Sequence, residues 1–414
     1  MDNVVDREES VAQSHTQNRP KSCAETATPK FVLKPAKKEK MGAQSLLERS
    51  LGQEYPCQDC GENMRATFIY GTKDIRVQEA PDPALLADTD VIVKVTAACV
   101  CGSDLWPYRG VSQVNEPRRI GHEFIGIVTE TGSAVTSLQS GDFVVAPWAN
   151  SCGQCPPCLN GVQIACEHRA PWGGKDENGL PVDGGQGEFV RVPNAEGTLV
   201  VVPGVSEPDE ALSKSLLALS DVMGTGHHAA VSARVEAGRS VVVVGDGAVG
   251  LSGVLAAKRL GATRIIAMSR HTDRAELAKE LGATDIVAER GVEAAEKVSE
   301  ILGGVLADSV LECVGTAESM EQALACVRPG GSLGFVGVPH GKEGLSLGLL
   351  FSKNISVAGG AASTRTYLPE LLEDVLAGTI NPGLVFDSVM PLERASEAYQ
   401  AMDERKAIKV MLIP

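Results

Sequence analysis

Apolar and polar positions follow two different patterns along the chain. From Met64 onward, short apolar runs such as MRATFIY and VIVKVTAA are separated by Gly, Pro and Asp. Runs of this kind between turn residues predict β-strands. From about Val222, apolar strand cores such as SVVVVG and RIIAMS alternate with helical segments such as AVGLSGVLAAKRLG. We therefore expect a barrel-like β domain, followed by a parallel sheet with crossover helices.

The first 63 residues differ from the rest, and their segment MDNVVDREESVAQSHTQNRPKSCAETATPK is polar, mixed in charge and without apolar periodicity. Such a segment is expected to be disordered, although the pattern over 43–51 is compatible with a short helix. Cys57 and Cys60 form a CxxC pair, but no second pair follows at zinc-finger spacing. We therefore interpret them as ordinary thiols rather than as a metal or redox site.

Composition limits the function classes. The 414 residues suffice for two domains, and the 44 glycines with 4% aromatics suit an α/β fold with many turns. A net charge of −15 argues against nucleic acid or an anionic membrane as partner. The chain has no apolar run of about 18 residues and no signal-peptide core. We expect a cytoplasmic protein with no nucleic-acid or membrane partner.

The segment VVVVGDGAVG predicts a dinucleotide site. Gly245, Gly247, Val249 and Gly250 follow four valines and open a helix, which is the context that this fingerprint requires. The glycines permit a tight turn, a close approach of the backbone to the pyrophosphate, and close helix–strand packing. The pyrophosphate would lie at the helix N-terminus, where free N–H groups favour anions.

The end of the next strand indicates which cofactor is used. NAD enzymes usually carry Asp or Glu there, whereas this chain has Ser269 and Arg270. An arginine beside a small hydroxyl residue can bind a 2′-phosphate through charge-assisted hydrogen bonds. The sequence therefore favours NADP(H). NAD(H) stays open as the second choice if Arg270 is only a solvated surface charge.

Four cysteines in one loop predict a metal site. They occur in CGQCPPCLNGVQIAC, a spacing unlike the common ferredoxin runs, and four thiolates suit tetrahedral zinc. Such a set leaves no open coordination position, which is typical of a structural site. Its members are Cys152, Cys155, Cys158 and Cys166.

Two upstream motifs, VCGSDLWPYRG and GHEFIG, complete a wider pattern. The order CGSD, GHE, four-cysteine loop and dinucleotide fingerprint resembles the zinc-containing medium-chain dehydrogenase/reductase superfamily, the alcohol dehydrogenases. The resemblance extends from Met64 to Pro414 and does not include the first 63 residues. It implies an α/β fold in which a Rossmann domain is joined to a GroES-like β-barrel catalytic domain. The boundaries expected are 1–63 for the disordered extension, 64–222 for the catalytic domain with both zinc sites, 223–357 for the Rossmann domain, and 358–414 for a return segment completing the catalytic domain.

The resemblance also implies a second, catalytic zinc. Its ligands correspond to Cys101 of CGSD, His122 of GHE, and Asp221 just before the Thr-Gly of LSDVMGTG. Three protein ligands leave a fourth position for water or substrate. Glu123 corresponds to a residue that approaches the metal, and Asp104 is expected to hydrogen-bond His122 and fix its tautomer. Two zinc ions per chain follow.

Further site residues come from the same resemblance. Ser103 corresponds to the hydroxyl residue that begins the family's proton relay, whereas Trp106 occupies the position where many members have the histidine that ends it. Trp106 and Trp148 predict a narrow, apolar substrate pocket, which argues against polyols. Thr225 is expected among the cofactor-binding residues. We interpret Cys99 as packing, and His227 and His228 as helix-start or cofactor-face residues rather than ligands.

These observations predict a zinc-dependent oxidoreductase that transfers hydride between a small, fairly apolar alcohol or aldehyde and NADP(H). Within this class, polyol or glutathione-independent formaldehyde dehydrogenase-like activity with NAD is the alternative. A cofactor-binding protein without catalysis and a zinc-ribbon nucleic-acid binder are other classes, which the intact catalytic set and the acidic charge disfavour. The resemblance implies a homodimer or homotetramer.

Overall fold

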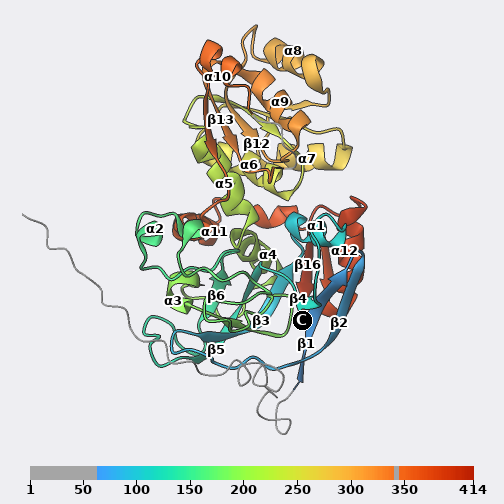
Figure 1. Ribbon diagram of the computed structural model, residues 1–414. Coiled ribbons are helices and arrows are strands. Elements are labelled where there is room, and N and C mark those ends of the chain that lie inside the picture. The colour runs from blue at the N-terminus through green and yellow to red at the C-terminus, as the bar shows by residue number, and fades with distance from the viewer. Residues whose placement is uncertain (1–62, 340–344) are drawn as a thin grey trace, which may run out of the picture. The chain divides into compact units, whose positions relative to one another are not determined.

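The computed structural model describes residues 63–339 and 345–414, which belong to one compact unit, Asp59–Pro414 (Figure 1). Asn63, the last residue of the expected extension, begins the first strand. The predictions of disorder before it, of a helix over 43–51, and of ordinary thiols at Cys57 and Cys60 lie outside the described residues.

A six-stranded parallel sheet with the order β11-β10-β9-β12-β13-β14 forms the dinucleotide-binding part. Val241 and Val243 of its central strand pack into one apolar cluster with α6, while Val242 and Val244 pack into another with α8 and α9. Apolar side chains on both faces explain why these strands are continuous apolar runs. The strands are β9 (Ser240–Val244), β10 (Arg264–Met268), β11 (Asp285–Val287), β12 (Ala307–Glu312), β13 (Val327–Phe335) and β14 (Ser356–Gly359).

Helices connect these strands, as the alternating pattern predicts. The sheet extends through Gly359, two residues past the expected boundary of the domain. The connecting helices are α6 (Ala248–Arg259), α7 (Thr272–Leu281), α8 (Gly291–Ile301), α9 (Ala317–Cys326) and α10 (Leu347–Lys353).

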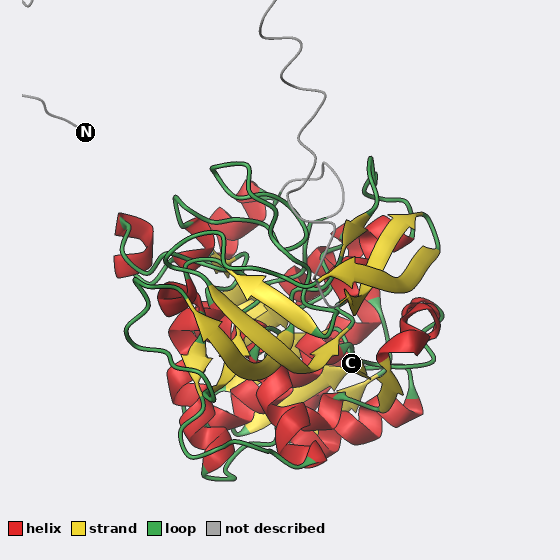
Figure 2. Cartoon of the chain, turned by 90° about the horizontal axis from the view of Figure 1, so that it is seen from below, coloured by secondary structure: helices red, strands yellow, loops and turns green. Residues whose placement is uncertain are grey.

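The remaining strands form the second part of the fold (Figure 2). A mixed sheet has the order β15-β16-β3-β5-β6-β8, with β7 also pairing with β3, and a smaller antiparallel sheet has the order β2-β1-β4. The strands are β1 (Asn63–Gly71), β2 (Asp74–Pro81), β3 (Val91–Cys99), β4 (Arg118–Arg119), β5 (Phe124–Thr131), β6 (Phe143–Ala146), β7 (Phe189–Val192), β8 (Val200–Val201), β15 (Ser388–Pro391) and β16 (Val410–Ile413).

The C-terminal segment returns to this second part. β16 pairs antiparallel with β3, with Met411 opposite Cys99, so the end of the chain lies beside the CGSD motif. The other helices and 3-10 turns are η1 (Gly102–Asp104), α1 (Leu105–Tyr108), α2 (Pro156–Leu159), η2 (Gln163–Ala165), α3 (Ala195–Thr198), α4 (Glu210–Leu219), α5 (Val222–Ser232), α11 (Thr364–Leu376), η3 (Pro382–Val385), η4 (Leu392–Arg394) and α12 (Ala395–Asp403).

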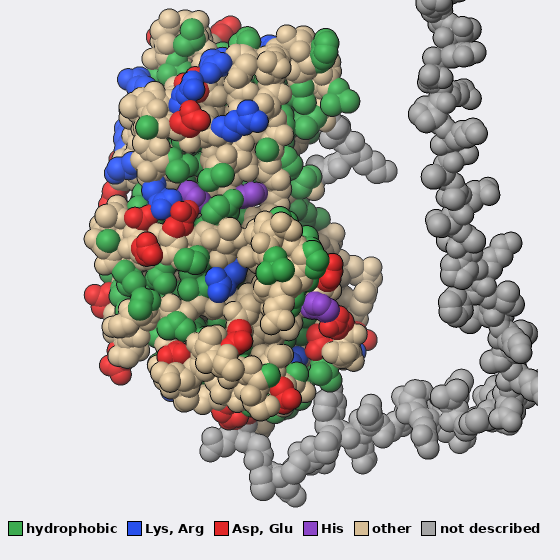
Figure 3. Space-filling view, turned by 90° about the vertical axis from the view of Figure 1, so that its left-hand side faces the viewer, with side chains coloured by type: hydrophobic (Ala, Val, Ile, Leu, Met, Phe, Trp, Pro, Cys, Tyr) green, Lys and Arg blue, Asp and Glu red, His purple; other side chains and the backbone are tan. Residues whose placement is uncertain are grey.

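On the face that Figure 3 shows, Lys and Arg side chains lie mainly on the upper half, and Asp and Glu side chains lie mainly on the lower half. Several charged side chains of the described residues are paired across elements, for example Arg259 with Asp374, whose Nε and Oδ2 atoms are 2.5 Å apart. Within the described residues, helices are too short and too polar to cross a bilayer.

Candidate metal centres and cofactor site

The first candidate metal centre gathers four side chains from three parts of the chain. Cys101 follows β3, His122 and Glu123 precede β5, and Asp221 lies immediately before α5. One ligand atom from each lies within 4.8 Å of the others. The structure therefore brings together the residues that the resemblance implied for the catalytic zinc.

The spacing of these atoms suits a tetrahedral ion. Cys101 Sγ is 3.6 Å from Asp221 Oδ2, and His122 Nε2 is 3.7 Å from the same oxygen. Ligand atoms about 2.0–2.3 Å from a tetrahedral zinc would stand about 3.3–3.8 Å from one another. The donor set of thiol, imidazole and carboxylate is also one that zinc accepts.

Asp104 positions two of these ligands. Its Oδ2 accepts a hydrogen bond from the Cys101 backbone N–H at 3.0 Å, and its Oδ1 lies 3.3 Å from His122 Nδ1. His122 Nε2 lies on the side of Asp221, 3.7 Å from its Oδ2. That Asp104 fixes the tautomer of His122 stays a prediction. Gln186 supports the carboxylate in turn, donating from Nε2 to Asp104 Oδ2 at 3.4 Å.

Glu123 and Lys409 form a buried ion pair. Lys409 Nζ donates to Glu123 Oε1 at 2.8 Å and to the Val100 carbonyl at 3.4 Å, and the two charged side chains are 1% and 0% exposed. Cys99 Sγ donates to Glu123 Oε2 at 3.3 Å, so this buried thiol does more than pack. Sequence reasoning missed Lys409. Its signal is a lone lysine opening the apolar C-terminal strand segment IKVMLIP.

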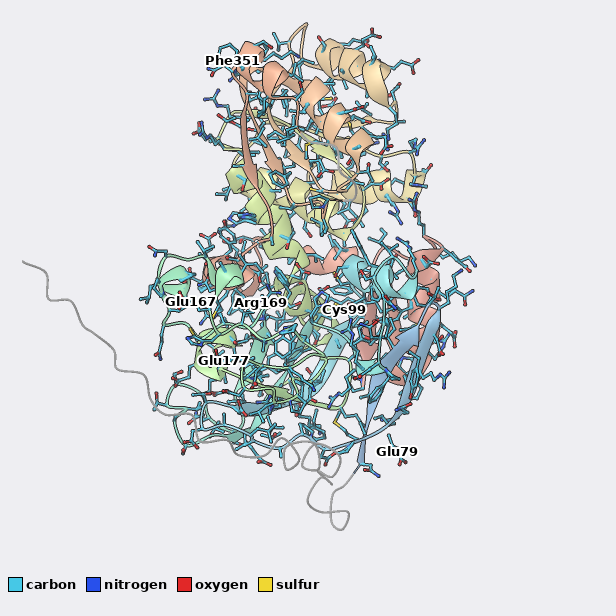
Figure 4. The ribbon with its side chains drawn as sticks, in the orientation of Figure 1. Glu79, Cys99, Glu167, Arg169, Glu177 and Phe351 are labelled. Atoms are coloured by element: carbon cyan, nitrogen blue, oxygen red, sulfur yellow. The ribbon has the colours of Figure 1, made fainter. Side chains whose placement is uncertain are left out.

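Ser103, Trp106 and Trp148, the other predicted site residues, differ in solvent exposure and in their contacts. Ser103 in η1 is exposed, and Trp106 is partly buried. The partly buried Trp148 donates from its indole nitrogen to the Ala362 carbonyl at 3.0 Å, and the Arg169 guanidinium lies 5.3 Å from the centre of its ring. Trp148 thus links the loop before the four cysteines to the return segment (Figure 4 labels Arg169).

The four-cysteine loop forms the second candidate metal centre, and its sulfur atoms lie within 4.8 Å of one another. Cys155 Sγ is 3.4 Å from Cys158 Sγ and 3.8 Å from Cys166 Sγ. A zinc–sulfur distance of about 2.3 Å gives a tetrahedral edge of about 3.8 Å, so the cluster can close on one ion. Although burial opposes it, the backbone N–H groups of Glu167 and Cys158 lower the pKa of Cys155 to about 6.

The glycine-rich turn between β9 and α6 has the geometry that a dinucleotide requires. Gly245 has φ +117°, which L side chains rarely adopt. A Cβ on Gly250 would lie 2.0 Å from the Gly245 carbonyl oxygen, whereas a Cβ on Gly247 would meet nothing within 4 Å. The turn is therefore tight on its inner side and open at Gly247, where the pyrophosphate is expected. Val249 lies in the first turn of α6.

Thr225 contacts a candidate metal ligand. Its hydroxyl donates to Asp221 Oδ1 at 2.6 Å, so it orients a candidate metal ligand. A contact between Thr225 and the cofactor stays a prediction.

Charged side chains from other segments lie beside Ser269, at the carboxyl end of β10. Ser269 is 2% exposed, and its hydroxyl donates to Asp246 Oδ2 at 2.7 Å. Arg274 Nη1 lies 3.5 Å from Asp246 Oδ1, while Arg270 is exposed. Burial and the Arg270 guanidinium lower the pKa of Arg290, and Asp246 raises it. Sequence reasoning missed Asp246, Arg274 and Arg290, because none stands at the strand-end position that the fingerprint singles out.

Comparison with known proteins agrees with both halves of the fold. Residues 87–204 match the alcohol dehydrogenase GroES-like domain, and residues 248–377 match the zinc-binding dehydrogenase domain. The chain is 33% identical to the zinc-type alcohol dehydrogenase B of Aspergillus flavus, over 84% of this chain and 81% of that protein.

Solved structures are similar over the same region. The alcohol dehydrogenase TADH of Thermus sp. ATN1 aligns with a TM-score of 0.77 and 32% identity, covering 84% of this chain and 99% of that one. A Sinorhizobium meliloti 1021 protein whose crystal structure contains NADP aligns with a TM-score of 0.72 and 27% identity, over 85% and all of the two chains respectively.

Proposed function

Because the chain belongs to the zinc-containing medium-chain dehydrogenase/reductase superfamily, the alcohol dehydrogenases, we propose that it interconverts a small, fairly apolar alcohol and its aldehyde, using NADP(H). The observation that carries the proposal is the convergence of Cys101, His122 and Asp221 on one point. Polyol or formaldehyde oxidation with NAD is the alternative.

Two zinc ions per chain are part of this proposal. Cys101, His122 and Asp221 would hold the catalytic ion, and the four-cysteine loop would hold a structural one. When bound, the catalytic ion polarises the C–O bond of the substrate and stabilises negative charge on its oxygen. Three protein ligands leave a position for that oxygen, whereas four thiolates leave none.

Three neighbouring residues orient the side chains of the candidate catalytic metal centre. Asp104 fixes His122, Thr225 fixes Asp221, and Lys409 holds Glu123 as part of a buried pair. Ser103 is assigned to the first step of the proton relay, in which its hydroxyl accepts the proton from the substrate oxygen and passes its own onward. Trp106 and Trp148 are assigned to the substrate pocket, where indole rings favour apolar chains.

The preference for NADP(H) rests on the cations near the end of β10. Arg270 follows Ser269 directly, and Arg274 Nη1 lies 3.5 Å from Asp246 Oδ1. A 2′-phosphate is the anion that such guanidinium groups bind well. The S. meliloti protein that contains NADP supports the plausibility of this cofactor on the same fold.

Cofactor titrations test the preference directly. NADPH and NADH are each titrated into the full-length, zinc-loaded protein, and steady-state rates follow with a panel of alcohols and aldehydes. Arg270→Ala should weaken NADPH binding by about tenfold or more and leave NADH nearly unchanged, because the lost contact is to the phosphate. Arg264→Ala, at the opposite end of β10, is the matched control. Equal or tighter binding of NADH by the wild-type protein contradicts the proposal.

We also propose a homodimer or homotetramer. Among the described strands, β14 lies at an edge of the parallel sheet and pairs only with β13. Beside it in sequence, Leu347 and Phe351 of α10 are 76% and 91% exposed (Figure 4 labels Phe351). An unpaired edge near exposed apolar side chains favours association. Sedimentation equilibrium tests the proposal, and a monomer at micromolar concentration contradicts it.

A further inference from the structure

A carboxylate lies within the candidate cofactor site, in the glycine-rich turn itself. Asp246 stands between Gly245 and Gly247, and its side chain is 19% exposed. Its Oδ2 accepts the 2.7 Å hydrogen bond from the buried Ser269 hydroxyl. Its Oδ1 and its carbonyl oxygen lie 3.5 and 3.4 Å from Arg274 Nη1. Asp246 is therefore fixed by contacts to the end of the next strand and to the helix that follows.

The sheet explains why these residues meet. β9 and β10 are parallel neighbours, with Val244 opposite Met268 at their carboxyl ends. The residues that follow the two strands must therefore leave the sheet side by side. Asp246 comes two residues after Val244, and Ser269 follows Met268 directly. A carboxylate from the first turn thus reaches the position where NAD enzymes place one from the second strand.

From this contact we infer that Asp246 is a specificity-determining residue that sets the balance between NADP(H) and NAD(H). The inference rests on the proposed function. Toward NAD(H), the carboxylate can accept a hydrogen bond from the ribose 2′-hydroxyl. Toward NADP(H), it opposes the 2′-phosphate in two ways, because it repels the negative charge and already engages the Ser269 hydroxyl that a phosphate would use.

The arginines keep the site open to a phosphate. Arg270 follows Ser269 directly, and Arg274 Nη1 lies 3.5 Å from Asp246 Oδ1, so two arginines adjoin the single carboxylate and its Ser269 partner. Asp246 lowers the affinity for NADP(H) without abolishing it, and it gives NAD(H) a specific partner. We therefore expect measurable binding of both cofactors by the wild-type protein.

Asp246→Asn removes the charge and keeps the size of the side chain. In the full-length, zinc-loaded protein, this change should raise the ratio of NADPH affinity to NADH affinity on the order of tenfold, the scale of one charge-assisted hydrogen bond. NADPH should bind more tightly and NADH more weakly. Asp273→Asn is the matched control, because Asp273 is an exposed acid in the first turn of α7.

Calorimetric titration with NADPH and NADH measures the effect without relying on turnover. Titration of 2′,5′-ADP and 5′-AMP into the same variants isolates the 2′-phosphate, and circular dichroism verifies that each variant is folded. If Asp246→Asn does not fold, Asp246→Ser takes its place, and it should raise the ratio of NADPH affinity to NADH affinity in the same direction.

The outcomes separate this inference from the proposed function. A ratio unchanged by Asp246→Asn, or an equal loss for both cofactors, overturns the inference, since Asp246 would then only shape the turn. Equal or tighter binding of NADH by the wild-type protein overturns the proposed NADP(H) preference. In that case a shift in the ratio on Asp246→Asn would still support the role of Asp246.

Discussion

Replacing Lys409 by Met should be among the most destabilising single changes that leave the candidate metal ligands themselves unchanged. Lys409 and Glu123 are 2.8 Å apart and almost fully buried. At that distance their attraction is about 6 kcal/mol for an effective dielectric constant of about 20, offset in part by the cost of burying both charges. Removing only the lysine leaves a buried carboxylate whose remaining side-chain partner is the Cys99 thiol. We expect a loss of about 3–5 kcal/mol in the free energy of unfolding.

The pH dependence of this loss gives a second signature. Burial already raises the pKa of Glu123, and Lys409 opposes that rise. Without the lysine, the pKa of Glu123 in the folded state should lie still further above its unfolded value. A carboxyl group with a raised pKa loses stability as pH rises through that pKa. The deficit of Lys409→Met should therefore be larger at about pH 8 than at about pH 5.

Equilibrium urea unfolding of the zinc-loaded protein measures both effects. Lys406→Met is the matched control, because the Lys406 side chain is 72% exposed. The double variant Glu123→Gln with Lys409→Met removes the orphaned charge and should recover at least half of the loss. The reasoning is refuted if Lys409→Met unfolds like the wild type, or if the double variant is no more stable than the single one.

Three further predictions address the metals, the proton relay and a buried histidine. Elemental analysis should find two zinc ions per chain. Cys155→Ser should lose one zinc together with stability, whereas Cys101→Ser should mainly lose turnover, and one zinc or fewer in zinc-supplied wild type would refute the two-site assignment. Ser103→Ala should bind NADPH normally but lose on the order of 10²-fold in kcat, most strongly at low pH in alcohol oxidation, and wild-type rates across pH would remove Ser103 from the relay. Burial lowers the pKa of His227, which is 2% exposed, to about 4, so the unfolded chain binds more protons between about pH 6.5 and pH 4. Stability should therefore fall by up to about 3 kcal/mol as pH drops through this window, and His227→Gln should flatten that fall in acid-unfolding curves, with the exposed His168→Gln as control.

Much of the candidate site could be read from local motifs, because their chemistry is carried by neighbouring residues. The four cysteines fall within fifteen residues, so one loop suffices to bring their sulfur atoms together. The glycine-rich turn is likewise complete in itself, since its strand, turn and helix are consecutive. The alternating apolar pattern also predicted the parallel sheet. The sequence pattern did not predict the exact ends of the strands, and β14 extends past the expected domain boundary.

Contacts between distant segments could not be read in the same way. Lys409 and Glu123 are 286 residues apart in sequence, and the pairing of β16 with β3 is what places the C-terminal strand beside the CGSD motif. The link from Trp148 to Ala362 spans 214 residues. The local sequence around one residue does not predict which distant residue it contacts, because that contact depends on which strands pair and in which register.

The amino-acid sequence by itself determined the family, the two-part α/β architecture, and the residue types that could bind zinc and a dinucleotide. Those features depend on short-range spacing and on apolar periodicity, and both can be recognised from neighbouring residues in the sequence. Only the tertiary structure decided which charges neutralise one another inside the protein. It placed Lys409 behind Glu123 and aligned Asp246 with Ser269, because parallel and antiparallel strand pairing brings together side chains that the sequence keeps apart.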